Sequence, residues 1–339
     1  MKSRGALPFL VALIGLVAAA VATGANSNAS SRAVCPGPPS GSARCHVAVV
    51  TDERGNPLAS SAPTGLSPAT IKSSYSFPSG TTANGCFSKV DQRGGTAYPR
   101  KDSGWALEIS LDIQWAHAIA PGSRILLVES DSNSFANLLA AEDYAKAHAQ
   151  YVSNSWGGSE FSGENAYDSH FVQSGVSFFV SSGDNGTPAE YPSASPNVIS
   201  VGGTTLHFAG GSFTDETGWS GSGGGCSAYE SKAAAQNTGS VCCGGKRATP
   251  DVSLDADPAS GVSVYDTTRY QGQAGWFTVG GTSASSPMWA GRAAVSGAIV
   301  NASYVYGSSI AFRDIISGNN GASAGPGYDL VTGRGSWTG

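Results

Sequence analysis

Charged side chains are scarce in this chain of 339 residues. Lys, Arg, Asp and Glu together make up 13% of it, about half the share found in an ordinary soluble protein. The formal net charge is -5 and basic residues form no block, so the chain lacks the electrostatic footprint of a nucleic-acid-binding protein. Because the chain has few carboxylates, little repulsion between charges builds up as these groups become protonated, which suits a protein exposed to acid. We expect no nucleic-acid partner.

Long apolar runs are missing as well, except at the N-terminus. Residues 1–4 are short and basic, and an apolar run over residues 6–22 ends in small residues near Ala25. This layout predicts a secretory signal peptide over residues 1–25. The alternative is a membrane anchor, although the run has only about the minimum length needed to span a bilayer. We therefore expect a secreted, extracellular protein with no membrane association once the signal is removed.

The six cysteines all follow the predicted signal, and none has the paired spacing of a structural zinc site. An even number of cysteines in an exported chain favours disulfides. Short loops favour a bond between Cys35 and Cys45, and one between Cys226 and either Cys242 or Cys243. Cys86 then has no obvious local partner.

Helical and strand patterns alternate through the middle of the chain. We expect helices over residues 105–118, 134–150, 164–174 and about 285–300, and strands over residues 124–129, 151–155, 177–181 and 198–201. Strands that are apolar on both faces and separated by helices predict a parallel sheet covered by helices, an α/β fold. Residues 26–79 are rich in Pro, Ser and Gly, which predicts a loosely structured leader or residual pro-segment.

The strongest chemical signal surrounds Ser283, in Gly-Gly-Thr-Ser-Ala-Ser-Ser-Pro at residues 280–287. It places a serine at a strand-to-helix junction, where glycines let a substrate backbone approach. The helix dipole there stabilises the negative charge that develops on an attacked carbonyl. The alternative is a serine that only caps the helix.

A nucleophilic hydroxyl needs a base, but histidine is an unconvincing candidate here. There are five histidines, and none lies in the His-Gly-Thr context of subtilisins. Glu108 and Asp112 instead lie four residues apart on a predicted helix, which places two carboxylates on one face. Such a pair is unfavourable unless a proton is shared, although an ordinary solvated face is the alternative. Asp184 follows a buried strand, either as a turn residue or, when protonated, as a hydrogen-bond donor to an oxyanion.

These three motifs, in this order, resemble those of the sedolisin or serine-carboxyl peptidase family, including its kumamolisin-like members. The similarity also covers residues 152–160 and 190–203. The resemblance implies a subtilisin-like, mostly parallel α/β fold with helices on both faces, in one catalytic domain over residues 80–339. It also implies a monomeric, acid-acting serine endopeptidase with protein or peptide substrates.

The resemblance also assigns roles. Ser283 is expected to be the nucleophile and Glu108 the general base and later acid. Asp112 is expected to orient Glu108, and Asp184 to bind the oxyanion beside the Ser283 amide. A glutamate base has an ordinary pKa of about 4.3, so an acidic optimum follows.

Two further sites are implied by the same resemblance. The stretch Ser155, Trp156, Gly157 and Gly158 resembles the edge that pairs with an extended substrate, with a simple glycine turn as the alternative. Near the C-terminus, a set of oxygen donors resembles the calcium site of the family: Asp314, Ile315, Gly325, Gly327 and Asp329. Two carboxylates and three carbonyls suit Ca²⁺, and we expect one structural Ca²⁺ that fixes the loops behind Ser283.

The chain departs from the family in one respect. Members begin the catalytic domain with a buried strand of the Val-Ala-Ile-Val-Asp kind and a helix, and neither precedes Cys86 here. The large propeptide is also missing or reduced. We expect a domain less stable than relatives that have the strand. Two rival interpretations remain: a catalytically impaired relative that binds peptides, favoured by the missing strand, and a subtilisin-type enzyme with a histidine base.

Overall fold

The computed structural model describes residues 30–58, 86–239, 241, 243–307 and 311–338. The predicted signal peptide and residues 26–29 and 59–79 of the predicted leader lie outside the described residues. Among the helices that are described, none has the length and apolar character needed to cross a membrane.

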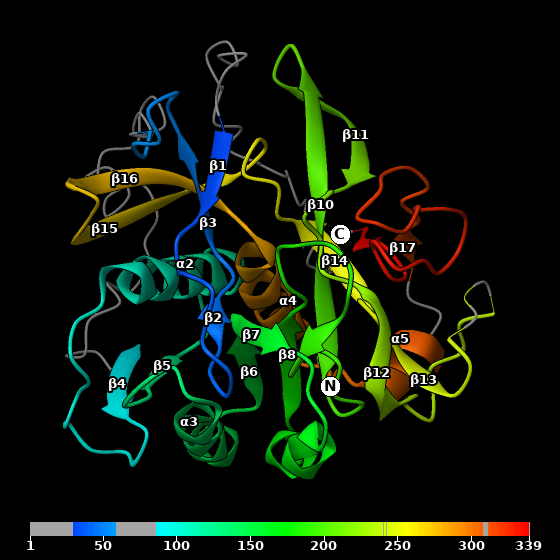
Figure 1. Ribbon diagram of the computed structural model, residues 1–339, viewed down its shortest axis with the longest axis horizontal. Coiled ribbons are helices and arrows are strands. Elements are labelled where there is room, and N and C mark those ends of the chain that lie inside the picture. The colour runs from blue at the N-terminus through cyan, green and yellow to red at the C-terminus, as the bar shows by residue number, and fades with distance from the viewer. Residues whose placement is uncertain (1–29, 59–85, 240, 242, 308–310, 339) are drawn as a thin grey trace, which may run out of the picture.

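A mostly parallel sheet forms the centre of the molecule (Figure 1). It pairs β6 (Tyr151–Asn154), β8 (Ser177–Ser181), β10 (Ile199–Ala209) and β14 (Val252–Asp255) in parallel, and β11 (Ser212–Gly218) pairs antiparallel with β10. Every residue of β8 is buried. Its side chains alternate between two cores, which explains why it shows a continuous apolar run instead of a polar face.

Helices cover both faces of this sheet, as the α/β prediction requires. α4 (Thr282–Ser296) packs on one face, and α2 (Ser103–Ile119) packs against α4. α3 (Phe135–His148) packs on the other face, next to η2 (Glu164–Phe171), which is a 3₁₀ helix shorter than the predicted one.

The N-termini of α2 and α3 are capped by the residues that precede them. The Asp102 carboxylate accepts from the amides of Gly104 and Trp105, and the Ser134 hydroxyl accepts from the amide of Asn137. Both helices therefore begin within two residues of their predicted starts.

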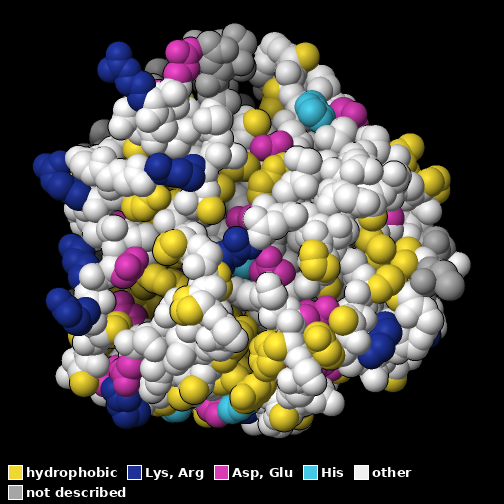
Figure 2. Space-filling view, in the orientation of Figure 1, with side chains coloured by type: hydrophobic (Ala, Val, Ile, Leu, Met, Phe, Trp, Pro, Cys, Tyr) yellow, Lys and Arg dark blue, Asp and Glu magenta, His cyan; other side chains and the backbone are white. Residues whose placement is uncertain are grey.

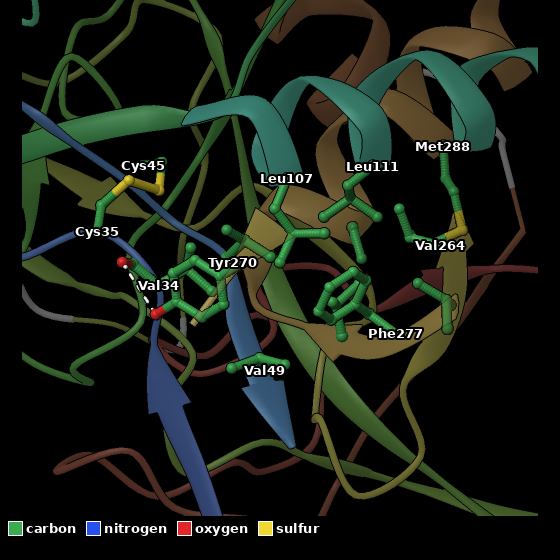
Figure 3. Close-up of a cluster of buried hydrophobic side chains, with 14 residues drawn as sticks. Val34, Cys35, Cys45, Val49, Leu107, Leu111, Val264, Tyr270, Phe277 and Met288 are labelled. Carbon is green, nitrogen blue, oxygen red and sulfur yellow. Dashed lines mark hydrogen bonds between the residues drawn. A yellow bond between two sulfur atoms is a disulfide. The ribbon is translucent and has the colours of Figure 1, made fainter. Parts of the chain in front are cut away.

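The buried face of α2 packs on a second, antiparallel sheet (Figure 3). Its order is β1 (Ser30–Ala33), β3 (Ala48–Thr51), β16 (Gln273–Gly280) and β15 (Val262–Tyr270). Leu107 and Leu111 are fully buried against Val264 and Phe277 of this sheet. Glu108 and Asp112 follow them by one position, so the carboxylates lie on the neighbouring stripe of the same helix.

The parallel sheet is interrupted where the sequence lacks a strand. β4 (Phe87–Asp91) and β5 (Ile125–Glu129) pair in parallel as a separate two-stranded sheet. α3 contacts both β5 and β6, yet no strand within the described part of the chain joins the two sheets.

Shorter elements complete the fold. They are β9 (Glu190–Tyr191), the pair β12 (Gly225–Ser231) and β13 (Lys246–Thr249), α5 (Ala302–Gly307), and the pair β17 (Phe312–Arg313) and β18 (Ser336–Trp337).

Residues 30–58 are more ordered than the sequence predicted. Besides β1 and β3 they contain β2 (Arg44–Cys45), which pairs with β7 (Trp156–Ser159). A strand of two residues has no pattern of its own, so only its distant partner and the disulfide between Cys35 and Cys45 order it. That disulfide was predicted, and the second forms between Cys226 and Cys243. The division into signal, leader and peptidase domain stays a prediction.

Candidate active site

Ser283 and Glu108 meet in the interior, between α4 and α2. The Ser283 hydroxyl donates to Glu108 Oε2 at 2.9 Å, and both residues are almost completely buried. Ser283 is the second residue of α4, which begins three residues earlier than predicted. The reason is a cap from a distant loop: Asp184 Oδ1 accepts from the Thr282 amide at 2.8 Å and from its hydroxyl at 3.0 Å.

Glu108 and Asp112 share a buried environment. Burial, and then the charge of Asp112, raise the pKa of Glu108 well above its ordinary value, while the hydrogen bond from Ser283 opposes this. Burial raises the pKa of Asp112 to about 7, although Asp112 Oδ1 accepts from the Ser155 hydroxyl at 2.6 Å. No described hydrogen bond joins the two carboxyl groups, and Glu108 Oε1 has no partner among the described residues.

Asp184 lies in the loop after β8. Burial raises the pKa of Asp184 to about 6, against the charge of His46 and the hydrogen bonds from Thr282. A side chain at Gly281 would collide with both Asp184 Oδ2 and the His46 carbonyl oxygen, so both atoms crowd against the backbone just before Ser283. Gly281 also has φ +98°, which favours glycine.

An extended segment of the chain's own N-terminal region crosses this site. β2 runs antiparallel to β7, with Arg44 opposite Gly157 and Cys45 opposite Trp156. The His46 amide then donates to the Ser155 carbonyl at 3.2 Å, and the Ser283 amide donates to the His46 carbonyl at 3.2 Å. The stretch expected to pair with an extended substrate pairs here with a segment of this chain, and its role in substrate binding stays a prediction.

The side chains of the crossing segment meet a buried carboxylate. His46 Nε2 lies 3.0 Å from Glu190 Oε2, its Nδ1 lies 2.8 Å from the Ser181 hydroxyl, and Arg44 Nη2 donates to Glu190 Oε1 at 2.9 Å. Burial alone would raise the pKa of Glu190, but the hydrogen bonds and charges of His46 and Arg44 lower it. In Figure 2 basic, acidic and histidine side chains meet near the middle of the face, where Figure 1 shows β2 beside β7.

Sequence reasoning missed this second group of residues. Arg44, His46 and Ser181 belong to no local motif, and only the fold brings them together. The sequence could have pointed to Glu190, because this residue begins the stretch 190–203 that resembles the family.

Comparison with known proteins identifies the family. The model of the subtilase family matches residues 98–309, more than half of the chain. The chain belongs to the subtilase family. The family resemblance predicted from the motifs is also confirmed, because the relatives of this subtilase are enzymes of the sedolisin and kumamolisin type.

Two sequences and one solved structure illustrate the similarity. This subtilase is 28% identical to kumamolisin of Bacillus sp. (strain MN-32) over 355 aligned positions, which cover 82% of this chain and 63% of kumamolisin. It is 35% identical to sedolisin of Pseudomonas sp. (strain 101) over 204 positions, which cover 48% of this chain and 33% of sedolisin. The chain thus spans less than two thirds of the length of either relative.

The solved structure is Pseudomonas sedolisin, a serine-carboxyl proteinase complexed with two molecules of pseudo-iodotyrostatin. The TM-score is 0.62 at 29% identity, and the match covers 77% of this chain and 85% of that one. The subtilisin-like α/β fold predicted from the sequence is therefore confirmed.

The residues expected to bind calcium gather around one loop of the subtilase. Asp314 Oδ2 accepts from the Gly327 amide at 2.9 Å, and Asp329 Oδ2 accepts from the Gly325 amide at 3.1 Å. The carbonyl oxygens of Ile315, Gly325 and Gly327 accept no hydrogen bond from a described residue. These oxygen donors fit a hard cation. The described residues contain no cluster of three or more His, Cys, Asp or Glu side chains that could hold a metal, and the calcium set has only two.

Proposed function

We propose that this subtilase is an acid-acting serine endopeptidase that forms an acyl-enzyme on Ser283. The observation that carries the proposal is the buried hydrogen bond from the Ser283 hydroxyl to Glu108, at 2.9 Å. A carboxylate at this distance can take the hydroxyl proton. The imidazole of His46 is the nearby alternative base, but both of its ring nitrogens are engaged, by Ser181 and Glu190.

The proposed roles of the three carboxyl groups depend on which of them carries a proton. Burial raises the pKa of Glu108, Asp112 and Asp184, and their charges oppose one another, so the site can hold no more than one negative charge at a time. We assign that charge in the reactive state to Glu108, because the hydrogen bond from the Ser283 hydroxyl favours its ionised form, while Asp112 and Asp184 keep their protons. Glu108 is then the base, and protonated Asp184 with the Ser283 amide can donate to the oxyanion.

The reaction then proceeds in two halves. The Ser283 oxygen adds to the peptide carbonyl while its proton passes to Glu108, and Glu108 returns that proton to the leaving amine. Water then adds to the ester, with Glu108 as base, and releases the acid. Because the pKa of Asp184 is about 6, ionisation above that pH removes a donor to the oxyanion, so activity is expected to fall toward neutrality.

Proteolysis of denatured casein between pH 3 and 8 tests the proposal. Activity confined to acid, abolished in Ser283→Ala and reduced on the order of 10²–10⁴-fold in Glu108→Gln, would support it. Ser296→Ala, at the exposed end of α4, is the matched control and should keep full activity. A neutral optimum would favour a histidine base instead.

The second candidate is a catalytically impaired relative that binds peptides. The interruption of the sheet between β5 and β6 favours it, since no described strand joins the two sheets. Absence of casein cleavage at every pH, with retained binding of an extended peptide, would establish this alternative.

We also propose that the mature protein is secreted, monomeric and stabilised by one Ca²⁺. The layout of residues 1–25 and two disulfides support export. Asp314, Asp329 and the carbonyls of Ile315, Gly325 and Gly327 would hold the ion, whose task is to neutralise the two carboxylates and fix their loop.

A further inference from the structure

Four carboxyl groups that the proposed mechanism does not use meet where η2 packs against β12. They are Glu160 in the loop after β7, Glu164 and Asp168 on η2, and Glu230 on β12. Glu164 is 0% exposed and Glu230 is 2% exposed, and the Oε1 atom of each receives no hydrogen bond from an N–H or hydroxyl group of the described residues. A carboxyl group buried in this way is stable only when it holds a proton or has a partner.

The four groups form two pairs, and each pair needs a proton. Glu164 is hydrogen-bonded to Glu160, and Glu230 is hydrogen-bonded to Asp168. Ionised carboxylates only accept hydrogen bonds, so one member of each pair must be protonated. Burial is the largest cause that raises the pKa of Glu164 to about 9 and that of Glu230 to about 7, and the adjoining carboxyl groups raise both pKa values as well. Glu164 and Glu230 are therefore the members that hold the proton in acid.

Both pairs connect η2 to β12. The Ser227 hydroxyl and the Ala228 amide of β12 donate to the two oxygens of Glu160, the amide at 3.0 Å. The pair of Glu164 with Glu160 thus joins η2 to β12 through an anchored side chain, and the other pair joins the same two elements directly. η2 depends on such contacts, because it is a 3₁₀ helix of eight residues without a side-chain hydrogen bond at its N-cap, and 3₁₀ helices of this length are uncommon.

The other titratable groups around the pairs leave this dependence on protons in place. Tyr191 of β9 donates to Asp168 Oδ1 at 3.3 Å, and burial raises the pKa of Tyr191, so it stays a neutral donor. The charge of Lys246 on β13 lowers the pKa of Glu230, yet the net shift of that pKa is upward. Where η2 faces α3, a separate set of groups is paired within itself: Asp143, Lys146 and His170.

We propose that the two carboxyl pairs form a proton-dependent latch, which holds η2 against β12 in acid and releases it as the pH rises to neutrality and above. When a pair loses its proton, two carboxylates face each other with little access to water, and their repulsion favours separation of the two elements. Glu160 directly follows β7 and Tyr191 belongs to β9, and these two strands pair beside the proposed active site. Release of the latch would therefore loosen one wall of that site, in addition to any ionisation of the catalytic groups.

The pH range of release follows from the raised pKa values. A glutamate in the unfolded chain titrates near about 4.3. The latch thus contributes its full stability below about pH 4. It loses this stability as the pH rises toward about 7 for the pair of Glu230 and toward about 9 for the pair of Glu164. η2 should accordingly open more readily at pH 8 than at pH 5.

Hydrogen exchange of the full-length chain tests the latch without any need for catalysis. The chain carries Ser283→Ala, so that self-digestion does not interfere, and exchange of residues 164–171 is measured between pH 5 and 8 and corrected for the intrinsic rate. Protection of η2 should fall at least about 10-fold over this range, since each proton released on opening changes the equilibrium by up to about 10-fold per pH unit. Glu164→Gln combined with Glu230→Gln cannot ionise and keeps an N–H donor for each partner, so its protection should stay nearly constant.

Asp131→Asn removes a surface carboxylate paired with Arg93 and is the matched control, which should show the same fall as the parent chain. Protection of η2 that is unchanged between pH 5 and 8 in the parent chain would overturn the latch, and this result is decisive even if the double variant does not fold. An equal fall in the double variant would also overturn it, because other groups would then drive the opening. Since no substrate is cleaved, neither result bears on the proposed function.

Discussion

The proposed mechanism gives Asp184 two tasks, and substitutions can separate them. Its Oδ1 caps α4 through Thr282, while its Oδ2 crowds Gly281 just before Ser283 and is the proposed donor to the oxyanion. Asp184→Ala removes both and should lower kcat/KM about 10²–10³-fold. Asp184→Asn keeps an acceptor for the cap and places an N–H at the other position.

The Asn variant should therefore retain most activity at pH 4 and extend it above pH 6, because an amide does not ionise as Asp184 does with its pKa of about 6. The measurement is a pH profile of kcat/KM for the wild type and both variants. Equal losses in Asn and Ala, with an unchanged profile, would show that Asp184 only caps the helix.

At the scale of residues, the sequence predicts what local patterns encode. Ser283, Glu108 and Asp184 meet in one buried site, because each lies in a motif whose spacing fixes its place on a helix or after a strand. Asp112 lies beside them but bonds to Ser155, a hydroxyl that the sequence interpretation assigned only to substrate binding. The pairing of His46 with Glu190 spans 144 residues, and no local pattern records such a contact.

At the scale of elements, β7 is the structure on which peptide selection should depend. Gly157 lies beside the ring of His46, in the segment that crosses the proposed active site. If a substrate pairs with β7 as this segment does, Gly157→Ala should lower kcat/KM about 10-fold for peptides with a large side chain in the place of His46, since one methylene group in a pocket has an effect of this size. Peptides with Ala there should be cleaved as before. A uniform loss for all peptides would indicate a disturbed β7 instead of a narrowed pocket.

The C-terminal loop is the second element with a measurable property. Chelation of Ca²⁺ at pH 6 should lower Tm by about 5–10 °C, if the ion is present at about 100 times its Kd. Asp329→Asn should lower Tm without a chelator and should no longer respond to one. Calcium titration of the chelated protein should restore the wild-type Tm. A Tm that changes neither with the chelator nor with calcium would exclude the site.

Elements with a long internal pattern were predictable, and those made by pairing were not. β8 has the bounds predicted from its apolar run, and α2 and α3 differ from their predictions by two residues at most. α4 begins early because its cap comes from Asp184, a residue 98 positions away. β2 escaped prediction because two residues cannot show a period, and its partner β7 lies far along the chain.

At the scale of the molecule, several carboxyl groups are largely withdrawn from solvent. Burial raises the pKa of Asp255 and Glu142 to about 8 and that of Asp112 to about 7, whereas in the unfolded chain these groups titrate near 4. Between pH 4 and 8 the unfolded state therefore binds fewer protons than the folded state. Stability is complete below the unfolded pKa and falls as the pH rises, by up to about 1.4 kcal/mol per pH unit and group.

Glu190 has a lowered pKa and works in the opposite direction, so its contribution is lost only as the pH falls through that lowered value. The balance places maximal stability in mild acid. Tm should accordingly be at least about 5 °C higher at pH 4.5 than at pH 7.5. Asp255→Asn can still accept the hydrogen bond from Ser260 and should flatten this dependence, whereas Asp131→Asn, on the surface, should not. If the wild type were as stable at pH 7.5 as at pH 4.5, the buried carboxyls could not hold their protons, and the division of charge proposed for the active site would lose its physical basis.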